Sequence, residues 1–334
     1  MTKLVNISGV ADFEAVPGID RLSEVRAADI ERHRPDSHWL LLDDNGHAAA
    51  RGSVWWNGAP SLPERHPLAE LRAGTIGHYA AVNDASGVAL LNHLCAQLAG
   101  HGCSLAIGPM DGNTWRRYRF VTDRGTESPF FLEPSNKPEY PDQWRTAGFE
   151  ELAGYTSGAT TDLTHSDPRL NRVRARIAEA GITLRPIDPA DFESELRRIF
   201  AMSLVSFQSN FLYTPISEAE FLGMYRAIEP YVRPELTIVA EEESRAVGFL
   251  FAVPDLTHPS PDTIIIKTLA VLPGRRYAGL GALLAEECHK TAARLGYRRA
   301  IHALMYDGNE SRNISNHTGE TIRRYSVFSR RLTQ

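Results

Sequence analysis

Residues 271–284 read VLPGRRYAGLGALL, an apolar segment that ends at a proline, continues into a basic glycine-spaced turn and leads into leucines at helical spacing. The apolar run 264–271 predicts a buried strand, which Pro273 ends because proline cannot donate to a strand ladder. The N–H groups in the first turn of the following helix have no intrahelical partner, and the helix dipole adds positive potential there. Because Gly279 and Gly281 let a ligand approach the backbone closely, the stretch predicts a site for a phosphate-type anion.

The spacing of the glycines narrows the kind of phosphate ligand. A dinucleotide fingerprint needs Gly-x-Gly-x-x-Gly, but the position of its third glycine is Leu284. A P-loop ends in Gly-Lys-Ser or Gly-Lys-Thr, and this loop does not. What remains is Arg-x-x-Gly-x-Gly, formed by Arg276, Gly279 and Gly281. An ordinary strand-to-helix turn with solvated arginines is the alternative interpretation.

With a strand before it and an amphipathic helix after it, this loop resembles the coenzyme A signature of the GNAT-type N-acetyltransferase superfamily. The resemblance implies acetyl-CoA as the cofactor, with the pyrophosphate held by the backbone and by Arg276. The residues that it assigns to the cofactor are Leu269, Ala270, Val271, Arg276, Tyr277, Ala278, Gly279, Leu280, Gly281, Ala282 and Asn309. Asn309 precedes Glu310-Ser311-Arg312, so a helix N-cap is an equally open role for it.

The same supersecondary unit occurs twice in the chain. A strand, a helix and a strand are predicted at residues 77–82, 88–98 and 104–107, and again at 269–271, 281–295 and 300–304. Each copy closes on Asp-Gly-Asn, at Asp111-Gly112-Asn113 and at Asp307-Gly308-Asn309. The first copy has only nine positions from Val82 to Leu91, against thirteen from Val271 to Leu284. Its shorter loop carries Asp84 in place of two arginines, so the first copy is predicted to keep the fold but not the cofactor.

Both halves therefore follow the order hairpin, strand, helix, strand, helix, strand. This order resembles that of the GNAT fold, and the resemblance implies an α/β protein (α+β mixed sheet) made of two tandem GNAT-like acyl-CoA N-acyltransferase domains. We place a degenerate domain without a cofactor loop at residues 1–165. A GNAT domain with the acetyl-CoA site is placed at residues 166–334.

The acid and base of the reaction are harder to assign. The superfamily commonly has a tyrosine seven residues beyond the asparagine, but that position is Asn316 here. Tyr306 is the nearest substitute as proton donor, and a core or rim aromatic is the alternative role. The superfamily's strand glutamate is also missing, because Lys267 stands two residues before Leu269. A water relay, or a residue such as Asp255 or Glu242, is left as the base.

The acceptor site is predicted in the loop of residues 206–215, which is rich in aromatic and amide side chains. Phe207, Asn210 and Tyr213 are the candidate residues that line a pocket for a small polar amine. Structural packing of a long loop is the alternative.

Composition excludes several other classes of protein. The formal net charge of -5 gives no general affinity for nucleic acid or an anionic membrane, and no apolar run approaches the ~20 residues of a membrane span. The twelve histidines show no His-x-x-x-His spacing, so no metal is predicted. Cys95, Cys103 and Cys288 are scattered and odd in number, which argues against a disulfide framework and favours buried thiols in a cytoplasmic protein.

The sequence thus favours an N-acetyltransferase that moves an acetyl group from acetyl-CoA to a small-molecule or peptide amine. A catalytically inactive acyl-CoA-binding or regulatory module of the same fold is the alternative. An aminoacyl transferase that uses charged tRNA is a third hypothesis, against which the acidic balance and the intact loop both count.

Overall fold

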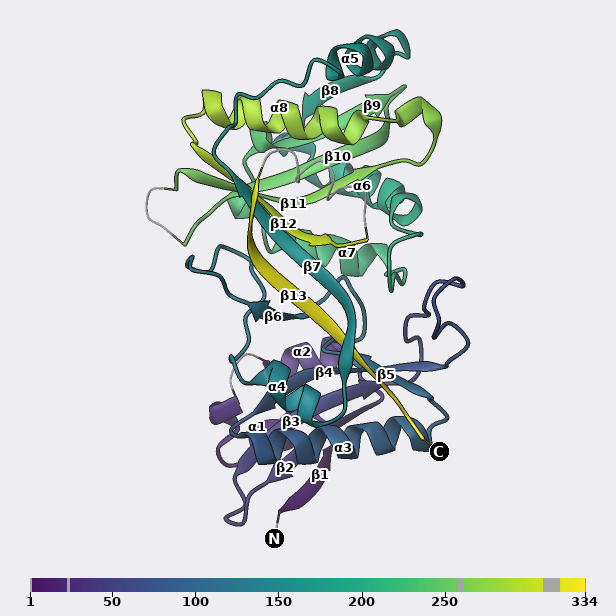
Figure 1. Cartoon of the computed structure of the whole chain (residues 1–334), viewed down its shortest axis with the longest axis vertical. Coiled ribbons are helices and arrows are strands. Elements are labelled where there is room, and N and C mark those ends of the chain that lie inside the picture. The colour runs from purple at the N-terminus through teal and green to yellow at the C-terminus, as the bar shows by residue number, and fades with distance from the viewer. Residues whose placement is uncertain (1, 23–24, 258–260, 309–318, 334) are drawn as a thin grey trace.

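A mixed sheet of 13 strands runs through the computed structural model, which describes residues 2–22, 25–257, 261–308 and 319–333 (Figure 1). The strands are β1 (Lys3–Ile7), β2 (Ser37–Leu42), β3 (Ala48–Trp55), β4 (Ala73–Ala81), β5 (Leu105–Gly108), β6 (Phe120–Asp123), β7 (Glu150–Thr160), β8 (Thr183–Pro186), β9 (Thr237–Glu242), β10 (Arg245–Pro254), β11 (Thr263–Val271), β12 (Arg299–Tyr306) and β13 (Glu320–Arg331). They lie in the order β1-β2-β3-β4-β5-β13-β7-β12-β11-β10-β9-β8, with β6 paired to β13.

The described residues contain eight α-helices. They are α1 (Val10–Glu14), α2 (Ala27–His33), α3 (Asp84–Gly100), α4 (Tyr140–Thr146), α5 (Leu170–Glu179), α6 (Phe192–Ser206), α7 (Glu218–Arg226) and α8 (Leu280–Arg294). Of these, α3, α6 and α8 pack on the sheet. The two long helices of the predicted repeat take matching places, because α3 packs on β3 and β4 while α8 packs on β10 and β11. Each connects a pair of parallel strands, β4 to β5 and β11 to β12. The predicted mixed α/β fold is therefore confirmed.

The two repeat units differ at the start of their helices. In the first unit β4 ends at Ala81, and Asn83 caps α3 by accepting a hydrogen bond from the Ser86 N–H at 2.9 Å. In the second unit a turn of residues 275–277 and the left-handed Gly279 come between β11 and α8. The apolar face of α8 is buried at Leu280, Leu283, Leu284 and Cys288, the leucine spacing from which the helix was predicted. All three cysteines are free and buried, as expected.

The last strands of the two halves are exchanged. β13, at the end of the chain, pairs with β5 of the first half, whereas β7 pairs with β12 of the second half. The two strands also pair with each other, from Glu320 opposite Ala159 to Ser329 opposite Glu150. In Figure 1 these two long strands cross between the lobes of the molecule. The division into residues 1–165 and 166–334 stays a prediction, but neither segment by itself contains all the strands of its lobe.

The described residues contain no helix with the length and apolar character needed to cross a bilayer.

Candidate active site

The candidate site lies where β11 and β12 separate. The two strands pair in parallel from Thr263 opposite Arg299 to Ile266 opposite His302, and both continue beyond that point. At this level each strand is irregular, because the register between β10 and β11 leaves Lys267 as an extra residue. On β12 the register with β7 shifts in the same place, where Leu304 has a left-handed φ of 62°. Bulges of this kind bend strands and redirect side chains, so the parallel pair opens here.

A cavity of about 780 Å³ occupies the opening between the strands. Its wall consists of residues 266–269 of β11 and 302–306 of β12, together with residues 114–119 and 132–135 from the first half of the chain. Further lining comes from the loop after α6. This volume is within the range of small-ligand pockets, roughly 300–1,000 Å³. Both halves of the chain therefore build one cavity.

Several residues predicted from the sequence meet in this cavity. Phe207, Asn210 and Tyr213 of the predicted acceptor loop all line it, as do Leu269 and Tyr306. Ala270 is buried, and Val271 is half-buried at the end of β11. Asn309 and Asn316 lie outside the described residues. The roles assigned to these residues remain predictions, but the structure brings the acceptor loop and the end of β11 to one place.

The predicted anion loop lies at the N-terminus of α8. Gly279 has a φ of 80° immediately before the helix, and a Cβ at this position would lie 2.9 Å from Cγ2 of Val173. Glycine is therefore required both by the backbone conformation and by the space available. The N–H groups of the first turn of α8 lack intrahelical acceptors, as in every helix, and suit an anion. Ala285, further along α8, lines the cavity and connects the loop to it.

Arg276 does not point freely toward an incoming phosphate, in contrast to the expectation from the sequence. Its guanidinium forms an ion pair with Glu242 and donates to the Ala180 carbonyl at 3.2 Å. The Tyr277 hydroxyl also donates to Glu242, at 2.8 Å. The spacing of the motif could not show this carboxylate, because Glu242 comes from the hairpin of β9 and β10. Arg275 is exposed beside it and forms no ion pair with the described residues.

Lys267, the extra residue of β11, faces the cavity from the point where the strands part. Its Nζ donates a hydrogen bond to the Leu132 carbonyl at 2.9 Å. Burial lowers the pKa of Lys267 to about 7, and the nearby Arg119 guanidinium contributes in the same direction, although Glu133 opposes it. A substantial fraction of this amine is therefore neutral near pH 7. The sequence marked Lys267 only as a departure from a family pattern, since burial cannot be read from one residue.

Arg119 is a second cation in the cavity wall that sequence reasoning missed. Its side chain lies over the rings of Tyr118 and Tyr155, at 3.9 and 4.4 Å from the ring centroids. Arg119 is only 8% exposed, donates to the Leu304 carbonyl at 3.1 Å, and has no hydrogen-bond partner at Nε. Among the described residues no carboxylate forms an ion pair with it. A buried guanidinium with a free N–H is a strong site for an anionic ligand group.

Glu133, the acidic residue among those that line the cavity, is already hydrogen-bonded to other side chains. Glu133 accepts from Arg323 Nε at 2.8 Å and from the Tyr325 hydroxyl at 2.6 Å. Asp255 and Glu242, the two carboxylates suggested as bases from the sequence, are not among the residues that line the cavity. Asp255 instead accepts from the Phe131 N–H at 2.9 Å and from the Thr257 hydroxyl at 2.7 Å.

Tyr306 lies at the end of β12, as the sequence predicted. Its ring stacks on Phe211, with 5.2 Å between the centroids and 10° between the planes. Burial raises the pKa of its hydroxyl. The hydroxyl therefore keeps its proton at neutral pH, which a proton donor requires.

Comparisons with known proteins agree with this arrangement. Residues 203–313 match the model of the acetyltransferase (GNAT) family. Protein YghO of Escherichia coli (strain K12) is 25% identical over 198 residues, which is 57% of this chain and 49% of that protein. The chain thus spans about half the length of this curated relative.

Solved structures share the fold over the whole chain. A tandem GNAT protein from the clavulanic acid biosynthesis pathway has a TM-score of 0.52 at 12% identity, with 100% of this chain and 99% of that chain covered. Eis1 from Mycobacterium abscessus has a TM-score of 0.57 at 11% identity, with coverage of 99% and 74%. At these identities the likeness concerns the fold alone.

Proposed function

Since this chain carries an acetyltransferase domain of the GNAT family, we propose that it transfers an acetyl group from acetyl-CoA to a small amine that also bears an acidic group. The observation that carries this proposal is the cavity between β11 and β12, whose wall holds the buried Arg119 and the half-buried Lys267. Its one acidic lining residue among those described, Glu133, is already engaged by Arg323 and Tyr325.

The loop before α8 fits the pyrophosphate of acetyl-CoA. The left-handed Gly279 leads into the first turn of α8, whose backbone N–H groups can donate to an anion, and the exposed Arg275 adds charge. Leu269 of β11 and Ala285 of α8 both line the cavity, where the pantetheine arm would bind. When bound, acetyl-CoA supplies a thioester carbonyl that an amine can attack.

Different side chains around the cavity can accept and donate the protons that acetyl transfer requires. The acceptor amine must lose a proton before it can attack, and the neutral form of Lys267 can accept one. The protonated Tyr306 hydroxyl, on the opposite strand, can donate a proton to the thiolate of coenzyme A as it leaves. Backbone N–H groups of β11 beyond Ile266, where its pairing with β12 ends, can stabilise an oxyanion. Lys267 therefore takes the place that the sequence left open for the base.

The acidic group of the acceptor would bind Arg119. Phe207, Tyr213 and the two tyrosine rings that contact the guanidinium provide apolar walls, and the Asn210 amide provides a polar contact. An acceptor that bears a carboxylate as well as an amine suits a wall that contains both Arg119 and Lys267 better than a simple alkylamine does.

The test is a thiol-release assay with matched pairs of acceptors. Each pair contains an amino acid and the amine that remains when its carboxyl group is removed. We expect coenzyme A release with the amino acid and at least a tenfold lower kcat/KM with its partner. Equal rates for both members would refute the acidic acceptor, and binding of acetyl-CoA without turnover of any amine would support the inactive-module alternative.

A further inference from the structure

The first half of the chain has its own opening between parallel strands. β4 and β5 pair only from Ala73 opposite Leu105 to Thr75 opposite Ile107. Beyond that point the register of β4 with β3 shifts, and His78 adopts a left-handed φ of 48°. His78 stands four residues before Val82, as Lys267 stands four before Val271. The bulge that carries Lys267 in the second half therefore carries a histidine in the first.

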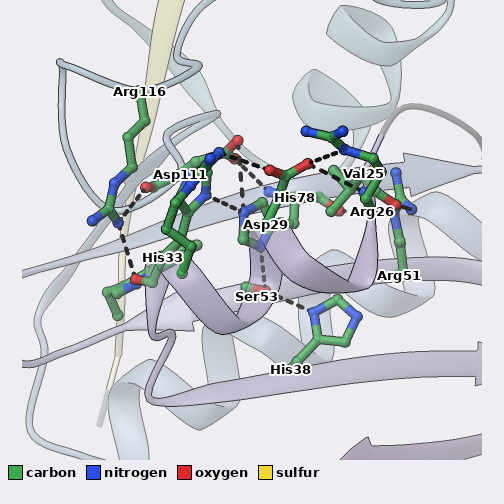
Figure 2. Close-up of polar contacts among 12 residues, drawn as sticks. Val25, Arg26, Asp29, His33, His38, Arg51, Ser53, His78, Asp111 and Arg116 are labelled. Carbon is green, nitrogen blue, oxygen red and sulfur yellow. Dashed lines mark hydrogen bonds and ion pairs between the residues drawn. The ribbon is translucent and has the colours of Figure 1, made fainter. Parts of the chain in front are cut away.

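We propose that His33, His78 and Asp111 form a binding site for a divalent transition-metal ion, with zinc as the expected occupant. Each residue offers one ligand atom, and these atoms lie within 4.8 Å of one another (Figure 2). Two imidazoles and a carboxylate are typical ligands of such ions, and a water molecule would complete a tetrahedral shell. The proposal is independent of the acetyltransferase function.

The groups around the cluster orient its ligand atoms. The Ser53 hydroxyl lies 2.9 Å from Nδ1 of His78, which directs Nε2 of that ring toward the other ligands. One carboxylate oxygen of Asp111 accepts the His78 N–H at 2.6 Å, and the other lies 3.8 Å from His78 Nε2. Second contacts of this kind fix the orientation of metal ligands in proteins.

The two imidazoles contact each other directly, so they must separate slightly to admit an ion. Nδ1 of His33 and Nε2 of His78 are 2.8 Å apart. Zinc–nitrogen bonds of about 2.0–2.1 Å in tetrahedral geometry separate two nitrogens by about 3.3 Å, so one ring must shift by roughly half an ångström. His33 can shift, because it is the last residue of α2 and is half-buried. His78 is held, being only 2% exposed.

The histidines can supply lone pairs at neutral pH. Burial lowers the pKa of His33 to about 4 and that of His78 to about 3, so both rings are neutral. Two guanidinium groups lie nearby and bind carbonyl oxygens: Arg51 binds that of His78 at 3.2 Å, and Arg116 binds that of His33 at 2.9 Å. They fix the backbone of the ligand residues. The charge of Arg116 is balanced by Glu220, at 2.7 Å.

The sequence predicted no metal because the ligands come from three separate segments. His33 ends a helix, His78 lies on a strand, and Asp111 follows the next strand. No local spacing connects them, and only the fold brings them together. An ion here would join α2 to the sheet at the position where the second half has its cavity.

Metal titration tests the proposal directly. Protein treated with a chelator is titrated with Zn²⁺ against a chromophoric competitor, and with Co²⁺ for its visible spectrum. We expect one ion per chain, a Co²⁺ spectrum of a tetrahedral nitrogen–oxygen site, and a Tm that rises with Zn²⁺. His33→Gln and Asp111→Asn should each weaken binding by at least about 100-fold, since each removes a ligand.

His289→Gln is the matched control. His289 and His302 form a second buried imidazole pair, with 2.9 Å between their Nε2 atoms, but no carboxylate completes a cluster with them among the described residues. This variant should bind zinc like the unmodified chain. Binding that His33→Gln and Asp111→Asn leave unchanged would overturn the proposal. So would a wild-type Co²⁺ spectrum of an octahedral aqua ion, a readout that needs no variant to fold.

Discussion

Lys267 carries its amine into a cavity where neighbouring groups disfavour its charged form. Burial and the Arg119 guanidinium together lower its pKa to about 7. Since the ordinary pKa of lysine is near 10.4, the unfolded chain binds more protons than the folded chain between about pH 7 and pH 10. This side chain therefore makes the protein more stable as pH rises through that window, and it destabilises the fold below it.

The first prediction concerns the pH dependence of catalysis. In the unmodified chain, kcat/KM should rise with pH to a plateau, with a midpoint near 7, because the neutral lysine accepts the proton. Lys267→Met should lose this limb and reduce kcat/KM by about 10²–10⁴-fold. Initial rates across the pH range, with Tm measured in parallel, provide the check. A variant that keeps the midpoint near 7 would show that another group titrates.

Arg119 determines the second prediction, which concerns the acceptor. Arg119→Met removes the guanidinium but keeps an apolar side chain against the rings of Tyr118 and Tyr155. A hydrogen bond to a charged group contributes about 1.5–3 kcal/mol, so kcat/KM for an acidic acceptor should fall roughly 10- to 100-fold. The matched amine without the carboxyl group is the control and should react as before. An equal loss for both would indicate a structural role.

At the scale of elements, the backbone of the loop between β11 and α8 was predicted correctly from its motif. The position of the Arg276 side chain was not, because it is paired with Glu242. The strand, the turn and the helix all follow from local patterns, namely the apolar run, Gly279 with its left-handed φ, and the leucine spacing. The ion pair of Arg276 with Glu242 depends on a hairpin that lies 34 residues away in sequence. Local patterns therefore predict the backbone of the loop but not the charge that it presents.

The third prediction follows from this ion pair. Glu242→Gln should release Arg276 and remove a negative charge from the loop, so the affinity for acetyl-CoA should increase. For a partly exposed pair, about 0.2–1 kcal/mol is expected, which corresponds to roughly 1.5- to 5-fold in Kd. Calorimetry measures the change, with Glu243→Gln as control because Glu243 is exposed on the same hairpin. Weaker binding in Glu242→Gln would mean that the carboxylate positions the loop.

Some residues of the candidate site could be predicted from local sequence, and others could not. Phe207, Asn210 and Tyr213 were identified from a loop rich in aromatic and amide groups, and they do line the cavity. Arg119 and Lys267 were missed as site residues because their significance depends on burial and on the lack of a carboxylate partner. Both properties arise only when segments from the two halves of the chain meet.

At the scale of the whole molecule, the exchanged strands couple the two halves energetically. Phe328 of β13 is fully buried and belongs to the core of the first half, where its ring lies 6.5 Å from that of Trp144. The predicted repeat gave the order hairpin, strand, helix and strand correctly for both halves in the described residues. The helix expected before β13 lies outside the described residues. The repeat did not indicate the exchange, because the pattern of a strand does not say in which lobe that strand will pair.

The fourth prediction tests this coupling. Phe328→Ala should lower the free energy of unfolding by about 3–5 kcal/mol, as is typical when a large buried aromatic is lost. The loss of stability should affect the first half of the protein, although Phe328 is close to the end of the sequence. Mass spectrometry of thiol labelling provides the readout, because Cys95 is buried in the first half and Cys288 in the second. Faster labelling of Cys288 alone would contradict the exchange.

The position of β13 also has a consequence for synthesis on the ribosome. β5 is complete once residue 108 has been made, but its partner strand in the sheet comes from residues 320–331. Translation proceeds at about 5–20 residues per second, so the edge of β5 waits for roughly 10–40 seconds before its partner exists. Open strand edges pair readily with other chains. The nascent protein therefore passes through a period in which its first half is exposed to aggregation, and protection by a chaperone would matter most during that interval.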